Sequence, residues 1–197
     1  MKNIKKNLVT KTQTAVQELL QGGVILHPTE TCYGLAVDIF NKAAVTKLYN
    51  LKDMAFDKPV SILVRDLQEA EAYGVFNEKA RDLAVKYWPG PLTLIVPRKA
   101  VVPKWVNFGM DSIGIRISSN KKAKELIEGF GGPLTTTSAN IHTQPQAYTV
   151  QDVLDQGLVP DFIIDSGKIG PTLPSTILKV DGEEVVLIRQ GPIQWPS

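Results

Sequence analysis

The chain has 197 residues, of which 43% are hydrophobic and 21% are charged, and its formal net charge is +2. These values are typical of a globular chain that buries its own core, and they indicate no general attraction to nucleic acid. No apolar run is long enough to cross a membrane and no secretory signal is evident, so the default prediction is a cytoplasmic protein without membrane contact.

Segments with helical periodicity alternate with short apolar runs that are typical of buried strands. In chain order, we expect a helix over 12–20, a strand over 24–26, an apolar–polar run over 35–40, a helix capped by Asn41, a strand over 60–64, helices over 67–73 and 78–88, strands over 92–96 and 113–117, a helix over 121–128, a strand over 134–137, a helix over 150–156 and a strand over 162–164.

The end of the chain predicts an antiparallel hairpin. Two apolar runs, 176–180 and 185–189, flank Asp181-Gly182, which is a strong turn signal, and Glu183 and Glu184 are expected to lengthen the loop. The sheet is therefore expected to be mixed. The fold class predicted from the whole pattern is α/β, in one domain over residues 1–197.

Cysteine and histidine are scarce. Cys32 is the only cysteine, which excludes an intrachain disulfide and favours a reducing compartment. The two histidines lie far apart, so no protein-bound metal is predicted. Residues 1–11 contain four lysines and no acidic residue. They are expected to form a flexible basic tail, with a weak polyanion contact as the alternative.

Several common catalytic motifs are missing from the sequence. It contains neither a GxxxxGK[ST] phosphate loop nor a GxGxxG fingerprint after a strand, and it has no GxSxG elbow. Neither His27 nor His142 stands in a recognisable triad context. A covalent serine hydrolase is therefore disfavoured, although a triad formed in space remains open. His27 ends a strand, where it has either no chemical role or a ligand contact.

Hydroxyl and cationic side chains gather at the ends of predicted strands. Thr29, Thr31 and Tyr33 follow the strand over 24–26, and they either bind oxygen atoms of a substrate or cap the turn locally. Arg116 and Arg189 lie within apolar strands, so each must face a pocket or a polar surface. A guanidinium in such a place suits bidentate binding of carboxylate or phosphate.

Five ordered motifs resemble those of the YrdC-like threonylcarbamoyl-AMP synthases, and the resemblance covers residues 12–193. Any one of them is weak, but their common order is specific. They are Pro28-Thr-Glu-Thr-Cys-Tyr-Gly-Leu35, Trp88-Pro-Gly-Pro-Leu-Thr93, Gly114-Ile-Arg116, Thr137-Ser-Ala-Asn140, and the closing Pro174-Ser-Thr-Ile177 with Arg189-Gln-Gly191.

The resemblance implies a twisted open mixed sheet flanked by helices, with a deep basic cavity, in the short single-domain form of the family. It implies that L-threonine, bicarbonate and ATP, accompanied by Mg²⁺, are condensed to threonylcarbamoyl-AMP and pyrophosphate. A partner transferase complex would then modify tRNA with the threonylcarbamoyl group. Direct binding of tRNA or double-stranded RNA is a further expectation.

The resemblance also implies a role for each matching residue. The amino acid would be held by Thr29, Thr31, Tyr33 and Thr137. Carboxylate and phosphate oxygens would face the catalytic cations Lys52, Lys58 and Arg116. The nucleotide would contact Lys52, Ser138, the backbone of Ala139, Asn140, Ser175 and Arg189.

One departure from the family pattern bears on activity. Met54 stands where the family has an arginine, and Lys58 or Arg65 is a candidate to replace it, Lys58 being the better placed. The hypothesis is that Met54 faces the triphosphate. Three alternatives remain open: a YciO-like paralogue that binds nucleotide or RNA without efficient synthesis, a carbamoyl-transfer domain like those of hydrogenase maturation proteins, and an RNA-binding module.

Overall fold

The computed structural model describes residues 12–141 and 143–195. The predicted basic tail over 1–11, and His142, lie outside the described residues. No helix in the described part of the chain is long and apolar enough to span a membrane.

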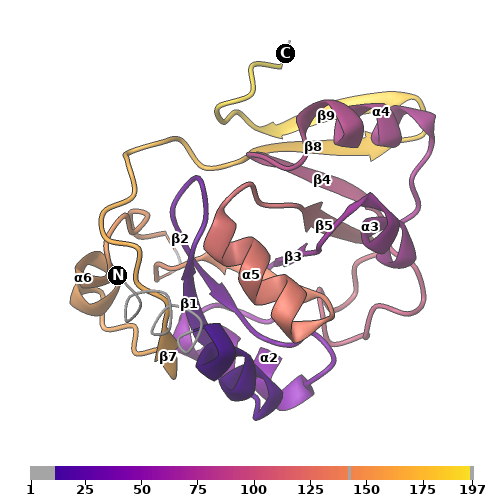
Figure 1. The fold of residues 1–197 in the computed structure, drawn as a ribbon. Coiled ribbons are helices and arrows are strands. Elements are labelled where there is room, and N and C mark those ends of the chain that lie inside the picture. Colours follow the sequence, from indigo (N-terminus) through magenta and orange to yellow (C-terminus); the bar gives the residue numbers. More distant parts are fainter. Residues whose placement is uncertain (1–11, 142, 196–197) are drawn as a thin grey trace.

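A mixed open sheet forms the centre of the molecule (Figure 1). Its strands run in the order β7-β1-β2-β6-β3-β5-β4-β8-β9. Only the β1–β7, β3–β5 and β4–β8 pairs are parallel, so the predicted mixed sheet is confirmed. The strands are β1 (Ile25–Pro28), β2 (Tyr33–Ala36), β3 (Ser61–Leu63), β4 (Leu92–Pro97), β5 (Ser112–Arg116), β6 (Leu134–Ser138), β7 (Phe162–Ile163), β8 (Thr176–Asp181) and β9 (Glu184–Arg189).

Helices flank the sheet because each buries one apolar stripe against it. A helix over 12–20 precedes β1. The others are α2 (Lys42–Leu51), α3 (Leu67–Tyr73), α4 (Glu78–Tyr87), α5 (Lys121–Phe130) and α6 (Val150–Asp155). The expected cap at Asn41 is confirmed, and Asn77 and Asn120 cap α4 and α5 in the same way: each of the three accepts hydrogen bonds from the first turn of the helix that follows.

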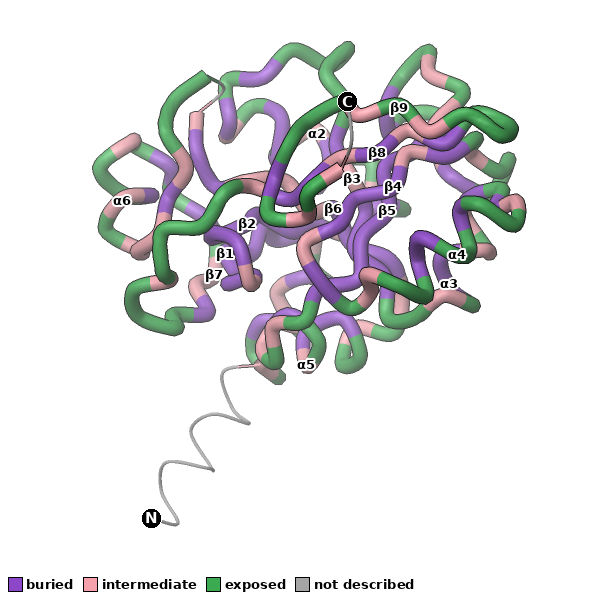
Figure 2. The backbone as a smooth tube through the Cα atoms, turned by 90° about the horizontal axis from the view of Figure 1, so that it is seen from above, coloured by how far each residue is buried: buried purple, intermediate pink, exposed green. Residues whose placement is uncertain are grey.

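Neighbouring residues of the strands contribute to two separate apolar clusters. Leu26 and Leu35 belong to the larger cluster, together with buried residues of α2, α3, α4 and α6. Ile25 and Ala36 belong to the smaller one, together with α5 and the helix over 12–20. Strand side chains alternate between the two faces of a sheet, which explains this division. Figure 2 shows the buried residues concentrated along the strands.

Several expected boundaries are corrected by the structure. Strand β2 begins at Tyr33, which was expected in the preceding turn. It ends at Ala36, so residues 37–40 lie outside it. The terminal hairpin is tighter than expected, because Glu184 pairs with Asp181 and only Gly182 and Glu183 remain in the loop. Gly182 has a φ of 59°, a left-handed conformation that a residue without Cβ adopts readily. The predicted lengthening of this loop is therefore wrong.

Candidate functional site

A cavity of about 160 Å³ lies over the middle strands of the sheet. Its walls come from segments that are far apart in sequence: the β1–β2 turn, the start of β3, the start of β4, the end of β5, the end of β6, and the entrance to β8 with the end of β9. Most of the predicted site residues line it, namely Thr29, Thr31, Tyr33, Arg116, Thr137, Ser138, Ser175 and Arg189.

The β1–β2 turn is organised by the hydroxyl of Thr29. That hydroxyl donates to the carbonyl of Cys32 at 2.7 Å and accepts from the amide of Thr31 at 3.1 Å. It also lies 3.0 Å from the Thr31 hydroxyl. Local capping of the turn, the alternative left open by the sequence, is therefore present at Thr29. The turn directs two side chains, Glu30 and Thr31, towards Arg116.

Arg116 is fixed by an acidic partner from the same turn. Its Nη2 donates to Glu30 Oε1 at 2.8 Å and to the Thr31 hydroxyl at 3.1 Å, while the Ser118 hydroxyl donates to Glu30 Oε2. Burial alone would raise the pKa of Glu30, but the charge and hydrogen bond of Arg116 outweigh it and hold that pKa below its usual value. The buried Nε of Arg116 has no partner among the described residues, so it remains available to an anion in the cavity.

Arg189 reaches the same cavity from the end of β9. Its guanidinium donates to the backbone oxygen and to the hydroxyl of Ser175, each at 3.0 Å, and that hydroxyl lies 2.9 Å from the hydroxyl of Thr93. Gly191 permits this arrangement, because a Cβ there would lie 2.2 Å from the carbonyl oxygen of Pro174. The closing Pro-Ser-Thr and Arg-x-Gly motifs thus form one contact.

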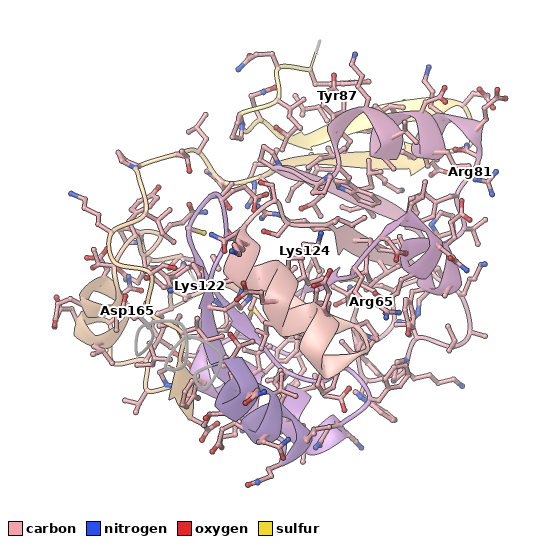
Figure 3. All side chains as sticks on the ribbon, viewed as in Figure 1. Arg65, Arg81, Tyr87, Lys122, Lys124 and Asp165 are labelled. Carbon is pink, nitrogen blue, oxygen red and sulfur yellow. The ribbon has the colours of Figure 1, made fainter. Side chains whose placement is uncertain are left out.

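The hydroxyl of Tyr33 is already engaged in the fold. It donates to the carbonyl of Gly167 at 2.8 Å and accepts from the amide of Ser166 at 2.8 Å, and it lies 3.1 Å from Asp165 Oδ1. Burial raises the pKa of Tyr33 to about 12. Lys122 of α5 donates to the carbonyl of Asp165, and the two lie side by side in Figure 3. Tyr33 therefore lines the cavity while its hydroxyl anchors the β7–β8 connection.

Lys52 lies behind the cavity wall rather than in it. Its side chain is 2% exposed, and its ammonium donates to the carbonyl of Asn140 at 2.6 Å and to that of Ser138. Burial lowers the pKa of Lys52 to about 8. The lysine thus fixes the backbone that follows β6 and does not line the cavity, and the phosphate contact expected from the sequence stays a prediction.

The turn after β6 divides its residues between the cavity and the interior. Thr137 and Ser138 line the cavity, and their hydroxyls make no hydrogen bond with the described part of the chain. Ala139 is buried, and its amide donates to the carbonyl of Tyr33 at 2.9 Å. The amide nitrogen of Asn140 donates to the carbonyls of Ile141 and Gln144. Ala139 and Asn140 do not line the cavity.

Met54, which stands in place of the family's arginine, and the two candidate replacements Lys58 and Arg65 do not line the cavity. Met54 is 9% exposed and belongs to the larger apolar cluster, so the expectation that it faces a triphosphate is wrong in this structure. Lys58 is exposed, one residue before Pro59, which does line the cavity. Arg65, labelled in Figure 3, pairs with Glu69 at 3.1 Å and lies outside the cavity.

Several residues of the site were not selected from the sequence. Glu30 does not line the cavity itself but pairs with Arg116, which does. It stood within a recognised motif, and its acidic side chain before Thr31 was the signal for a partner to Arg116. Ser61 carries a hydroxyl that has no hydrogen bond within the described residues; a Cβ on Gly114 would lie 2.5 Å from it, which explains the glycine of the Gly-x-Arg motif. Gln146 lines the cavity with a buried, unpartnered Oε1, and no sequence signal marked it.

The described residues contain no group of three or more His, Cys, Asp or Glu side chains placed to hold a metal ion. The cavity instead presents hydroxyls and two guanidinium groups, Arg116 and Arg189. These are donors suited to carboxylate and phosphate oxygens. The structure therefore combines an open mixed α/β sheet with a cavity whose hydrogen-bond donors suit anions.

Comparison with known proteins agrees with the open mixed α/β fold and shows the family of the chain. The Sua5/YciO/YrdC family model, described as "Telomere recombination", matches residues 17–191. The chain belongs to the Sua5/YciO/YrdC family. A relative from Methanocaldococcus jannaschii is 40% identical over 181 residues, covering 90% of this chain and 85% of the relative. The threonylcarbamoyl-AMP synthase of Vibrio cholerae is 31% identical over 188 residues, covering 93% of this chain and 99% of that protein.

Among solved structures, Sua5 of Pyrococcus abyssi in complex with L-threonine superposes with a TM-score of 0.86 at 31% identity. The match covers 91% of this chain and 54% of the Pyrococcus protein, so the chain spans about half the length of that relative. The predicted family and the predicted open α/β fold are confirmed by these comparisons.

Proposed function

We propose that this protein is an L-threonylcarbamoyladenylate synthase, a nucleotidyltransferase that makes threonylcarbamoyl-AMP and pyrophosphate from L-threonine, bicarbonate and ATP. The observation that carries the proposal is the meeting of Arg116 and Arg189 in one hydroxyl-lined cavity. Full-length similarity to the Vibrio cholerae synthase and similarity to a threonine-bound relative give it independent support.

The chemistry needs positioning and charge neutralisation rather than a nucleophilic side chain. The amine of threonine attacks carbon dioxide and loses a proton, or attacks bicarbonate with loss of water, to give a carbamate. A carbamate oxygen then attacks the α-phosphorus of ATP, and pyrophosphate leaves with the electrons of the broken P–O bond. Each step places negative charge in the cavity, where fixed guanidinium and hydroxyl donors stabilise it.

The positions of the hydroxyl and guanidinium groups suggest how the substrates divide the cavity. Thr31 and Arg116 form one side and would bind the carboxylate of threonine, with Thr137 beside them. Ser138, Ser175 and Arg189 form the other side and would bind the nucleotide. In this arrangement Lys52 and Tyr33 support the walls. A direct role for Lys58 remains a prediction.

ATP enters as its magnesium complex, so Mg²⁺ is part of the substrate and its ligands are chiefly phosphate oxygens and water. The product would pass to a threonylcarbamoyl transferase complex that modifies tRNA, and we place the reaction in the cytoplasm with its tRNA. Binding of tRNA or double-stranded RNA to this chain itself belongs to the same proposal.

The experiment that tests the function is incubation of the purified chain with L-threonine, bicarbonate and MgATP, followed by assay of pyrophosphate and threonylcarbamoyl-AMP. Pyrophosphate release should require threonine and bicarbonate together. ATP cleavage that ignores both substrates would contradict the proposal. Binding of ATP without any product would instead favour the YciO-like paralogue, which the named relatives do not favour.

A further inference from the structure

Just before β3, at the edge of the cavity, the backbone N–H and C=O of Val60 have no partner in a neighbouring strand. Ser61 is the first residue of β3 to pair with a neighbouring strand, opposite Gly114 of β5. Val60, one residue earlier, is 3% exposed and also lines the cavity. Its N–H and C=O point away from any strand partner, and leaving buried backbone groups unpaired is costly.

Asn107 solves this problem from a different loop. Its Oδ1 accepts from the amide of Val60 at 2.8 Å, and its Nδ2 donates to the carbonyl of Val60 at 3.0 Å. A side-chain amide has the same donor and acceptor as a peptide group, so Asn107 pairs with Val60 as a neighbouring strand would. Asn107 is 1% exposed, which protects both bonds from water.

The loop that presents Asn107 is itself held in shape. Residues 98–111 connect β4 to β5, and we call them the β4–β5 loop. The guanidinium of Arg98 donates to the carbonyls of Val102, Pro103 and Val106 at 2.6, 2.8 and 2.7 Å. Asn107 has a φ of 52°, a left-handed conformation that asparagine tolerates better than most residues.

The same stretch of cavity wall has a second anchor. The hydroxyl of Tyr49, on α2, donates to the carbonyl of Lys58 at 2.7 Å. Residues 58–61, which we call the wall segment, are therefore fixed at Lys58 by α2 and at Val60 by the β4–β5 loop. Pro59 lies between the two anchors and Ser61 follows the second, and both line the cavity.

We propose that Asn107 is a positioning residue for the reaction: it holds the wall segment so that Pro59 and Ser61 complete the substrate cavity. This inference rests on the proposed function. Asn107 does not line the cavity itself, so its effect must pass through Val60, which does. When groups that orient a substrate are displaced by a small distance, the substrate is no longer held in its productive position, even when the substituted residue is remote from the chemistry.

The test compares two variants in the same loop of the full chain. Asn107→Gly removes both hydrogen bonds to Val60 and accommodates the positive φ. Gly109→Ala is the matched control, because Gly109 has a φ of 76° and its Cβ would meet nothing within 4 Å. That control strains the loop but keeps the Asn107 bonds. Asn107→Asp retains the acceptor for the Val60 amide and serves if the glycine variant does not fold.

Three readouts separate positioning from stability: Tm, the KM values for L-threonine and MgATP in pyrophosphate release, and hydrogen exchange of the Val60 amide. We expect Asn107→Gly to raise at least one KM by about tenfold or more, and to speed exchange at Val60. Gly109→Ala should lower Tm while leaving both KM values and that exchange near wild type.

Equal changes in the two variants, or a lower Tm in Asn107→Gly with unchanged KM values, would overturn the proposal. Failure of the synthase function gives a different pattern, since the wild-type chain would then release no threonine-dependent pyrophosphate. In that case the positioning role is tested by the dissociation constant for MgATP and by hydrogen exchange of the Val60 amide. The proposal then requires that Asn107→Gly changes both quantities and that Gly109→Ala changes neither.

Discussion

The buried ammonium of Lys52 donates to the carbonyl oxygen of Asn140 at 2.6 Å. This bond joins the end of α2 to the turn after β6, and a second bond from the same ammonium reaches the carbonyl of Ser138. No carboxylate of the described residues forms an ion pair with it. The dipoles of the two carbonyl groups stabilise its positive charge. In return, the ammonium supplies hydrogen-bond donors to these two carbonyl oxygens.

Replacing Lys52 by methionine should therefore destabilise the fold as well as the site. Two carbonyl oxygens would lose charge-assisted hydrogen bonds, and we expect the free energy of unfolding to fall by about 3 kcal/mol. Urea denaturation measures this change. The control is Lys47→Met, because the Lys47–Asp161 pair is largely exposed and its loss should cost under about 1 kcal/mol. Equal costs would show that the carbonyl contacts of Lys52 contribute nothing.

Arg189→Ala should weaken nucleotide binding far more than it lowers Tm. Arg189 is the last residue of β9 and lines the cavity. Among the described residues, its guanidinium donates hydrogen bonds only to the backbone oxygen and the hydroxyl of Ser175. Loss of one charge-assisted contact to phosphate should raise the dissociation constant for MgATP by about 10- to 100-fold. Isothermal titration calorimetry measures the constant. Arg81→Ala is the control, because Arg81 pairs with Glu71 at the surface; a similar loss of affinity there would contradict the prediction.

His27 should make stability fall in mild acid. Burial lowers the pKa of His27 to about 4 in the folded chain, against an ordinary value of 6.5. Between these two values the unfolded chain binds the proton and the folded chain does not, so the free energy of unfolding decreases as pH falls. We expect a loss of about 2 kcal/mol between pH 7 and pH 4.5.

Urea denaturation at these two pH values checks the effect, and His27→Gln should flatten the dependence in this window. The Glu30 carboxyl, whose pKa is lowered from 4.5, contributes to acid sensitivity only at lower pH. A pH dependence that persists unchanged in His27→Gln would assign it to another group.

Met54→Arg should destabilise the chain rather than improve ATP binding. The sequence hypothesis placed a guanidinium here against the triphosphate, but Met54 packs in the larger apolar cluster. An unpaired charge in that cluster should cost about 3–5 kcal/mol of unfolding free energy, whereas Met54→Leu should cost less than about 1.5 kcal/mol. Thermal denaturation and ATP titration of both variants test this. Tighter ATP binding by a stable Met54→Arg variant would restore the original hypothesis.

Local patterns in the sequence predicted most helices and strands, because caps such as Asn41 and turn signals such as Asp181-Gly182 act over a few residues. The motifs also predicted which segments meet in the cavity. They could not predict the direction of each side chain. Lys52 donates to two backbone carbonyls and the Tyr33 hydroxyl donates to the carbonyl of Gly167. Both directions depend on partners that lie far along the chain. Asn107 carried no signal because its role appears only when Val60 lies beside it.

The anchoring of Tyr33 and the pairing of Glu30 with Arg116 have a consequence for how the cavity forms during folding. Their partners lie 133 residues away at Ser166 and 86 residues away at Arg116. Contacts of such long range carry a high chain-closure cost and form slowly. The cavity should therefore appear only when the first and last strands have joined the sheet. A chain truncated before Ser175 would lack both Ser175 and Arg189, and ligand binding would report completion of the fold.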